Sequence, residues 1–365
     1  MKLRVEKESF LKAIGSISGA VSQRSTMQIL SNILIETVGK GQVRLTGTDL
    51  ELGIVCTTST EVLEEGSITI PAKKIHDIIK ELPQGAFELV VAKNNTVTIK
   101  NEKSYFKLVG LPKDDFPKLP EPQKESSLEI EQKQLKECLN LTNFAVSHDE
   151  TRYVLNGVLC LVEGKAMKIV ATDGRRLAYV KKELPGAGNF KMEAIIPTKT
   201  VQELGKILGE QGTVKITPVG NQIIFSVGEI QLISRLIEGH FPNYEQVIPK
   251  EEKVTAKLDC QKFLSAVRRA SLLTSPEAQA VKLDVTKNKL LISSRSPNLG
   301  ESREEVDSEV KGDDIVIGFN PSYLIDVLRN IGVETVEVSF SNPDKPAVMR
   351  GKEGYLCVIM PMQLN

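Results

Sequence analysis

Apolar residues follow the i, i+3, i+4, i+7 spacing of an amphipathic helix in three segments that each contain an early proline. These segments begin near Pro71, Pro197 and Pro321, and proline in the first turn favours helix initiation. A second helical pattern begins near Phe10, returns near Phe263 and recurs more loosely around Leu135. The sequence therefore predicts six helices, two in each of three repeated segments.

Alternating polar and apolar residues between these helices predict β-strands. The runs ILIETVGKGQVRLTG, VLCLVEGKAMKIVAT and VKLDVTKNKLLISS each have the pattern of a β-hairpin. Three further strands follow each second helix, as FELVV, TVTIK and YFKLV in the first repeat. Each repeat therefore has the predicted order β-α-β-β-β-β-α-β-β-β, which indicates an α+β fold of three similar domains.

Two proline-rich segments separate the repeats, LPKDDFPKLPEPQ at 111–123 and HFPNYEQVIPKEE at 240–252. Both contain Phe-Pro, so the linkers repeat as well. We expect domains at 1–122, 123–250 and 251–365, each close to the commonest domain size.

The stretch Thr172-Asp173-Gly174-Arg175-Arg176 combines a carboxylate with two guanidinium groups and could suggest catalysis. Thr48-Asp49 stands at the equivalent point of the first repeat, after its third strand, and the third repeat has Ser293-Ser294-Arg295 there. A loop that recurs belongs first to the fold, and Asp-Gly favours a turn. We therefore interpret the stretch as a structural turn.

Catalytic and cofactor motifs are absent from the sequence. The three histidines, His76, His148 and His240, lack metal-ligand spacing, and there is no phosphate-binding glycine loop. The segment 300–309, GESREEVDSE, is rich in carboxylates, which is more typical of a solvent-exposed edge than of a catalytic site. The sequence predicts no catalytic residues, no metal and no cofactor.

Composition narrows the class of protein further. The net charge is +0, aromatic residues make up 5% and there is no Trp, which disfavours a single-strand-binding protein. The five cysteines are far apart and lack a disulfide pattern, which suits a reducing compartment. Glu6 and Glu8 interrupt any signal-peptide pattern, so we expect a soluble cytoplasmic protein.

Several motifs together resemble the bacterial sliding clamp, the β subunit of the replicative DNA polymerase III holoenzyme. They are Thr172-Asp173-Gly174 with Arg176-Leu177, Phe241-Pro242-Asn243-Tyr244, Gly318-Phe319-Asn320 with Tyr323, and the tail Val358-Ile359-Met360-Pro361-Met362. The resemblance extends over essentially the whole chain.

This resemblance implies a head-to-tail homodimer, a ring of six similar domains with helices inside and sheets outside. Such a ring encloses double-stranded DNA without reading its sequence and catalyses no reaction. The implied partners are the replicative DNA polymerase, a clamp loader complex and other proteins that carry a short clamp-binding motif.

The resemblance also assigns candidate residues. The partner-peptide pocket between the second and third domains would contain Leu155, Thr172, Gly174, Arg175, Arg176, Leu177, Pro242, Val247, Asn320, Tyr323, Val348, Val358, Ile359, Met360, Pro361 and Met362. Leu177 and Arg176 would present one wall of it. Candidate DNA contacts are Arg24, Lys73, Lys74, Arg152, Tyr153 and Lys199. The dimer contact would join Leu272 and Leu273 to an edge strand with Phe106 and Leu108, near Lys74.

Three features depart from the family pattern: Arg175 where His is frequent, Glu245-Gln246 where basic residues are usual, and Gln363 where Arg is usual. Two other hypotheses stay open on the sequence alone. One is an enzyme that uses the loop from Asp173 to Arg176 for phosphate chemistry, and the other is a monomeric adaptor that binds peptides and never encloses DNA.

Overall fold

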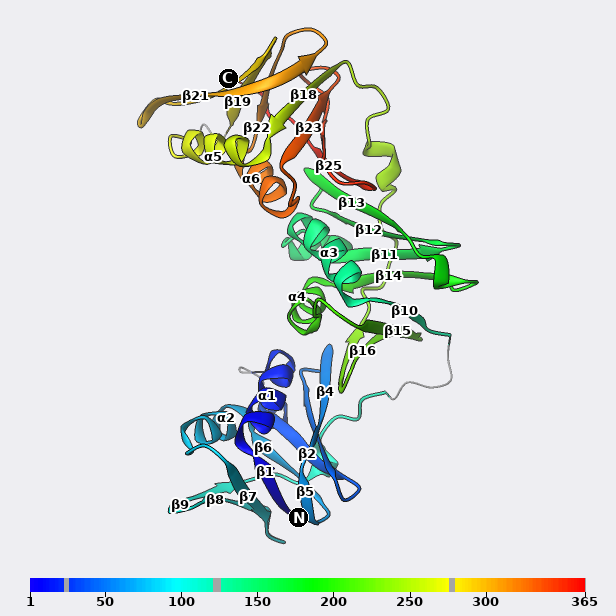
Figure 1. The fold of residues 1–365 in the computed structure, drawn as a ribbon, viewed down its shortest axis with the longest axis vertical. Helices are drawn as coiled ribbons and strands as arrows, with labels where there is room; N and C mark the ends of the chain where they lie inside the picture. The colour runs from blue at the N-terminus through cyan, green and yellow to red at the C-terminus, as the bar shows by residue number, and fades with distance from the viewer. Residues whose placement is uncertain (23–25, 121–125, 276–279, 365) are drawn as a thin grey trace. The chain divides into compact units, whose positions relative to one another are not determined.

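The computed structural model describes most of the chain, and Figure 1 labels its helices and strands. The described residues are 1–22, 26–120, 126–275 and 280–364. They form two compact units, one made of Met1–Lys133 with Gln202–Leu236 and the other of Gln134–Val201 with Ile237–Asn365. We call these the first and the second unit and describe each by itself.

The first repeat has one strand more than predicted. Its elements are β1 (Lys2–Glu6), α1 (Lys7–Ile17), β2 (Asn32–Val38), β3 (Gln42–Thr48), β4 (Leu52–Ser59), β5 (Glu61–Glu64), β6 (Ser67–Pro71), α2 (Ala72–Glu81), β7 (Ala86–Val91), β8 (Thr96–Asn101) and β9 (Ser104–Val109). The additional strand is β5, which pairs with β1, whereas β4 pairs with β3.

The second and third repeats follow the predicted order in their described residues. The second contains β10 (Leu128–Glu131), α3 (Gln132–Thr142), β11 (Gly157–Glu163), β12 (Ala166–Thr172), β13 (Arg176–Glu183), β14 (Met192–Pro197), α4 (Thr198–Ile207), β15 (Thr213–Val219), β16 (Gln222–Val227) and β17 (Ile230–Arg235). The third contains β18 (Val254–Asp259), α5 (Cys260–Ser271), β19 (Val281–Thr286), β20 (Lys289–Ser296), β21 (Gly300–Lys311), β22 (Ile315–Phe319), α6 (Pro321–Asn330), β23 (Thr335–Phe340), β24 (Ala347–Arg350) and β25 (Tyr355–Ile359).

The helices bury the residues that the spacing predicted. In α1 the buried positions include Phe10, Ile14 and Ile17, and in α5 they include Phe263 and Val267. Within each unit the helices of one repeat lie side by side, α1 with α2 and α5 with α6 (Figure 1). Burying the apolar stripes of such helices against a sheet is a main source of their stability.

The first unit contains two antiparallel sheets. The five-stranded sheet has the order β5-β1-β7-β8-β9, and the eight-stranded sheet has the order β10-β15-β16-β17-β4-β3-β2-β6. The pairing of β17 with β4 joins strands of the second and first repeats, with Gln231 opposite Val55 and Ser234 opposite Leu52.

The second unit is built on one twelve-stranded sheet. Its order is β14-β11-β12-β13-β25-β24-β23-β18-β21-β20-β19-β22. The pairing of β13 with β25 joins the second and third repeats, with Leu356 opposite Tyr179 and Ile359 opposite Arg176. The two units thus use the same device to connect successive repeats, an antiparallel pairing between edge strands.

Candidate functional site

The loop at 172–176 leads from β12 into β13 and is held by its own side chains. The Asp173 carboxylate accepts hydrogen bonds from the backbone N–H groups of Arg175 and Arg176, at 2.9 and 3.0 Å. The Thr172 hydroxyl donates to the Arg176 carbonyl at 2.6 Å and accepts from the Gly174 N–H at 3.1 Å. These contacts satisfy the backbone of a tight turn and leave Asp173 fully occupied, in agreement with the structural interpretation of this stretch.

Gly174 is required by the backbone of this loop. Its φ of +84° lies in the left-handed region, where a side chain is strained. A Cβ at this position would also lie 2.9 Å from Nη1 of Arg152, which donates to the Asp173 carbonyl at 3.2 Å.

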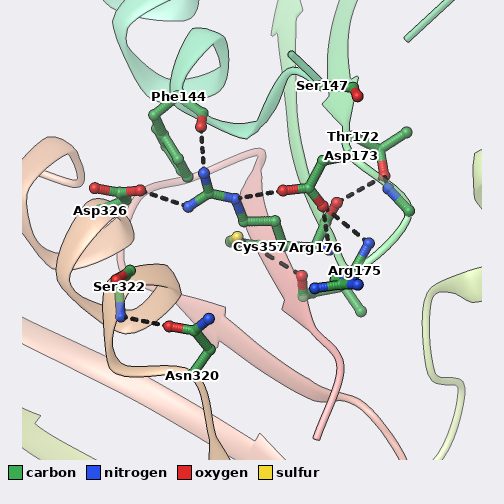
Figure 2. A network of polar contacts seen from close by, with 12 residues as sticks. Phe144, Ser147, Thr172, Asp173, Arg175, Arg176, Asn320, Ser322, Asp326 and Cys357 are labelled. Atoms are coloured by element: carbon green, nitrogen blue, oxygen red, sulfur yellow. Dashed lines mark hydrogen bonds and ion pairs between the residues drawn. The ribbon is translucent and has the colours of Figure 1, made fainter. Parts of the chain in front are cut away.

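Arg176 is the centre of a polar network that connects three segments of the second unit (Figure 2). Its Nε donates to Asp173 Oδ2 at 3.1 Å, its Nη1 to Asp326 Oδ2 at 2.6 Å, and its Nη2 to the Phe144 carbonyl at 2.7 Å. The side chain of Arg176 is only 10% exposed. Because the guanidinium is planar and has donors on all sides, it can bind three acceptors at once.

Aromatic rings lie near the Arg176 guanidinium. Its Cζ is 4.6 Å from the centroid of the Tyr323 ring and 5.4 Å from that of Phe144, both within cation–π range. Tyr323 belongs to the first turn of α6, which begins at Pro321 and is capped by the Asn320 side chain through the Ser322 N–H at 2.9 Å. The cap and the ring contact orient the start of α6 toward the loop.

The C-terminal tail continues the sheet pairing past the end of β25. The Met360 N–H donates to the Arg175 carbonyl at 2.9 Å, and the Met362 N–H donates to the Gly318 carbonyl at 2.8 Å. Gly318 is the position where the tail approaches most closely, since a Cβ there would be 2.6 Å from a Leu364 methyl. The tail is therefore held at Met360 and Met362, on either side of Pro361.

Below the loop lies a buried apolar cluster that includes Leu177, Val348 and Val358. Residues of the 240–252 linker cover it: Phe241, Tyr244 and Ile248 pack against these side chains. Tyr244 also stacks on Tyr179 with ring centroids 5.9 Å apart. Burial raises the pKa of both tyrosines, so their hydroxyl groups stay neutral at physiological pH.

The predicted site residues divide into a buried floor and an exposed rim. Leu155, Thr172, Leu177, Val348, Val358 and Ile359 are buried. Gly174, Arg175, Pro242, Val247 and Met360 are exposed, and Arg176, Asn320, Tyr323, Pro361 and Met362 are half-buried. Leu177 and Arg176 were expected to present a wall. In the structure Leu177 lies in the buried apolar cluster with 3% exposure. Arg176, the preceding residue of β13, points to the opposite face of the sheet and contacts Asp173, Asp326 and the Phe144 carbonyl.

Two members of the network, Phe144 and Asp326, were not among the predicted site residues. Asp326 lies one helical turn after Tyr323, so its position on the same face of α6 was the available signal. Phe144 contributes a backbone carbonyl from the 3₁₀ turn Asn143–Ala145, and no sequence pattern marks such a carbonyl.

The polar groups of this site join structural segments to one another. Burial raises the pKa of the Cys357 thiol, on the neighbouring strand, to about 12, so it is a poor nucleophile at neutral pH. No group of three His, Cys, Asp or Glu residues that could hold a metal ion occurs in the described part of the chain. All five cysteines are buried and free.

Three of the six candidate DNA contacts are exposed side chains at the starts of α-helices. Lys73 and Lys74 lie in the first turn of α2, and Lys199 lies in the first turn of α4. Arg152 and Tyr153 lie on the 3₁₀ segment Glu150–Leu155. Arg24 lies outside the described residues. The first and third helices end at Ile17 and Thr142, and 3₁₀ turns follow them.

The candidate dimer residues lie at exposed edges of their own units. In the first unit β9 is the last strand of its sheet, with Phe106 exposed and Leu108 half-buried. In the second unit Leu272 follows the last residue of α5 and is 75% exposed, while Leu273 is half-buried. No helix within the described ranges is long and apolar enough to cross a membrane.

Comparison with known proteins gives three consecutive family matches. The N-terminal, central and C-terminal domain models of the DNA polymerase III beta subunit match residues 1–120, 129–243 and 245–363. Beta sliding clamps from Pseudomonas aeruginosa and Vibrio cholerae are 34% and 31% identical, over 100% of both chains in each case. The matches therefore cover the whole architecture and not one repeat of it.

Solved structures agree with this result. The sliding clamp of Bacillus subtilis has a TM-score of 0.97 at 31% identity, and that of Pseudomonas aeruginosa bound to griselimycin has a TM-score of 0.95 at 34% identity. Each covers 100% of both chains. Fold and site together define a class of three-domain, non-catalytic replication proteins.

The chain belongs to the bacterial beta sliding clamp family, the beta subunit of DNA polymerase III. It is a DNA sliding clamp, which acts as a homodimeric ring on duplex DNA and binds the polymerase and the clamp loader without a catalytic role. This membership decides against the enzyme and the monomeric adaptor.

Proposed function

We propose that the exposed rim around the 172–176 loop is the surface on which this clamp binds the short motifs of its partners. The observations that support this assignment are the Arg176 network, which fixes the loop to α6, and the bond from the Met360 N–H to the Arg175 carbonyl, which fixes the tail to the loop. Met360, Val247 and Pro242 then remain exposed above a buried apolar floor.

The binding chemistry follows from that arrangement. Met360 is 41% exposed and Val247 is 48% exposed, so both offer apolar surface to a partner side chain. Methionine adapts its shape to different ligands, which suits a surface shared by several partners. Arg175, exposed beside Gly174, adds a positive charge to the rim.

Griselimycin is a suitable probe, since it is bound in solved structures of the Pseudomonas aeruginosa and Bartonella birtlesii clamps. Calorimetric titration of the full-length protein should give saturable binding, and Met360→Asp and Val247→Asp should each weaken it at least about tenfold. Val316→Asp, an exposed valine on β22 outside the rim, is the matched control and should leave the affinity unchanged. Equal affinities of the rim variants and the wild type would refute the assignment.

We further propose that Lys73, Lys74, Lys199, Arg152, Tyr153 and Arg24 lie along the DNA path. The lysines in the first turns of α2 and α4 support this proposal best. A helix N-terminus carries partial positive charge and disfavours cations, so lysines at this position indicate a role other than helix stability. Lys73→Gln with Lys74→Gln should reduce the salt dependence of DNA binding. An unchanged slope of log affinity against log salt would contradict this role.

For the dimer, we propose contact between Leu272 and Leu273 of one subunit and the β9 edge of another, at Phe106 and Leu108 near Lys74. Exposed apolar side chains beside an unpaired strand edge support it. Leu272→Asp should shift sedimentation equilibrium toward monomer, whereas Leu299→Asp, also an exposed leucine, should not. A Leu272→Asp protein that sediments as the wild-type dimer would exclude this contact.

We also propose domain boundaries at 1–122, 123–250 and 251–365, in keeping with the two Phe-Pro linkers. Limited proteolysis should cut first within 111–123 and 240–252, and fragments that end elsewhere would require other boundaries.

We also propose that the protein is located in the cytoplasm, because it works on replicating DNA.

A further inference from the structure

A cavity of about 880 Å³ lies in the first unit, between the sheet and the linker segment 113–120. Its floor includes one cross-strand row on β2, β3, β4 and β17. The row consists of Leu34, Thr46, Val55 and Gln231, each paired with the next across the sheet. The volume lies in the range of cavities that bind ligands.

The second unit contains the equivalent row, and there the space is filled. Leu159, Val170, Tyr179 and Leu356 occupy the same positions on β11, β12, β13 and β25. Tyr244 of the linker stacks on Tyr179, and the linker residue Ile248 packs against the same cluster. The row and its linker therefore close into a continuous apolar core.

The two rows differ in sequence at three of their four positions. Val170, Tyr179 and Leu356 are replaced by Thr46, Val55 and Gln231, so two positions become polar and one loses an aromatic ring. In the linkers, counting from the shared Phe-Pro, Leu119 takes the place of Tyr244. Leu119 lies against Gly53, where a Cβ would be 2.7 Å from its methyl. The first unit thus lacks both aromatic rings that fill the second.

The charged lining of the cavity favours an anionic ligand. Arg44, Lys113 and Lys118 face it together with Glu36 and Asp114, which leaves one positive charge in excess. Lys113 and Glu36 form an ion pair at 3.7 Å, so these two charges largely compensate each other.

We propose that this cavity is a second docking site of the clamp, for a partner peptide that inserts a tyrosine flanked by a carboxylate. The tyrosine ring would take the space that the Tyr179–Tyr244 pair fills in the other unit. Thr46 and Gln231 supply hydrogen-bonding groups for its hydroxyl, which an apolar row could not offer. Lys118 attracts the neighbouring carboxylate. The site is separate from the rim around Met360, so it does not depend on the docking surface proposed above.

The test uses the full-length protein and the fluorescein-labelled peptide Ala-Asp-Tyr-Asp-Ala as probe, with fluorescence anisotropy as readout. We expect saturable binding with a dissociation constant of about 100 μM or tighter. The peptides Ala-Lys-Tyr-Lys-Ala and Ala-Asp-Ala-Asp-Ala should each bind at least about tenfold more weakly, because each lacks one of the two recognised groups. A wild-type protein that does not bind the probe would overturn the proposal.

Two variants locate the probe. Val55→Tyr combined with Gln231→Leu introduces the residues of the second unit and should reduce affinity at least about tenfold by filling the cavity. Lys118→Gln changes one charge without filling space and should weaken the acidic probe about threefold without weakening the lysine peptide. Met360→Asp should not change probe binding. If Met360→Asp abolished binding while the cavity-filling variant bound normally, the probe would occupy the rim, and the cavity proposal would be wrong.

Discussion

The loop at 48–52 in the first unit and the loop at 172–176 in the second have the same hydrogen bonds at five equivalent positions. Thr48 and Thr172 each donate to the carbonyl four residues on, and each accepts an N–H two residues on. Asp49 and Asp173 each accept hydrogen bonds from the backbone N–H groups two and three residues on.

The strand pairing after the two loops is equivalent as well. The Arg235 N–H donates to the Glu51 carbonyl at 2.9 Å, and the Met360 N–H donates to the Arg175 carbonyl at the same distance. The first loop thus leads into the β4–β17 junction and the second into the β13–β25 junction.

The two loops differ in sequence at their last three residues, and the third and fifth have the largest structural consequences. Leu50 adopts a left-handed φ of +80° where Gly174 has +84°. Leu52 is a core residue with 1% exposure, whereas Arg176 reaches the acceptors Asp173, Asp326 and the Phe144 carbonyl. The same loop conformation therefore carries a buried apolar side chain at the β4–β17 junction and a polar network at the β13–β25 junction.

The largest expected effect comes from making the second junction resemble the first. Arg176→Leu removes the guanidinium and leaves Asp326 without this partner, so the free energy of unfolding should fall by about 3 kcal/mol. Urea denaturation measures this change. The double variant Arg176→Leu with Asp326→Leu should recover part of the loss, since no carboxylate remains unpaired at that point. A single variant as stable as the wild type would mean that the network does not hold the junction.

The third position should give a smaller effect of opposite sign in the two loops. Gly174→Ala should lose about 1–2 kcal/mol, because its φ is left-handed and its new methyl group meets Arg152. Leu50→Gly should gain up to about 1 kcal/mol by relieving the same strain, less the entropy that glycine adds to the unfolded chain. Thermal unfolding of both variants provides the measurement. Loss of stability in Leu50→Gly would show that its side chain contributes more than its backbone costs.

The two threonines should behave alike. Thr48→Val and Thr172→Val each remove a hydroxyl that bridges the loop, and each should cost about 1 kcal/mol in urea denaturation. Thr213→Val, at an exposed residue at the start of β15, serves as the control and should stay within about 0.5 kcal/mol of the wild type. A clear difference between the two loop variants would contradict their equivalence.

The smallest effect at neutral pH concerns Cys357, whose equivalent in the first unit is Leu232, a residue that does not titrate. Burial raises the pKa of Cys357 from 9.0 to about 12. The unfolded chain therefore ionises first as pH rises, so this contribution to stability is complete below pH 9 and is lost between 9 and 12. Between pH 8 and pH 10 the wild type should lose more stability than Cys357→Ala in urea titrations. Identical losses would assign the alkaline sensitivity to other groups.

The sequence was sufficient for the repeats, because helical and strand periodicities depend on local side-chain order. The hairpins at 33–47, 158–172 and 281–294 and the six helices follow from that order. The sequence also predicted that Thr48-Asp49 and Thr172-Asp173 lie at equivalent points, and in the structure Thr48 and Thr172 each end the third strand of their repeats.

The tertiary structure decided what the local pattern leaves open. Asp326 and the Phe144 carbonyl lie 150 and 32 residues from Arg176, so no nearby spacing links them to the loop. Whether Leu177 faces a partner or the core depends on the side chains packed over it, and its apolar cluster, which includes linker residues, leaves it only 3% exposed. The same holds for the cavity over Thr46 and Val55, because its emptiness depends on which linker side chains reach the sheet. Periodicity is a property of neighbours in the chain, whereas burial and pairing depend on residues brought together only by folding.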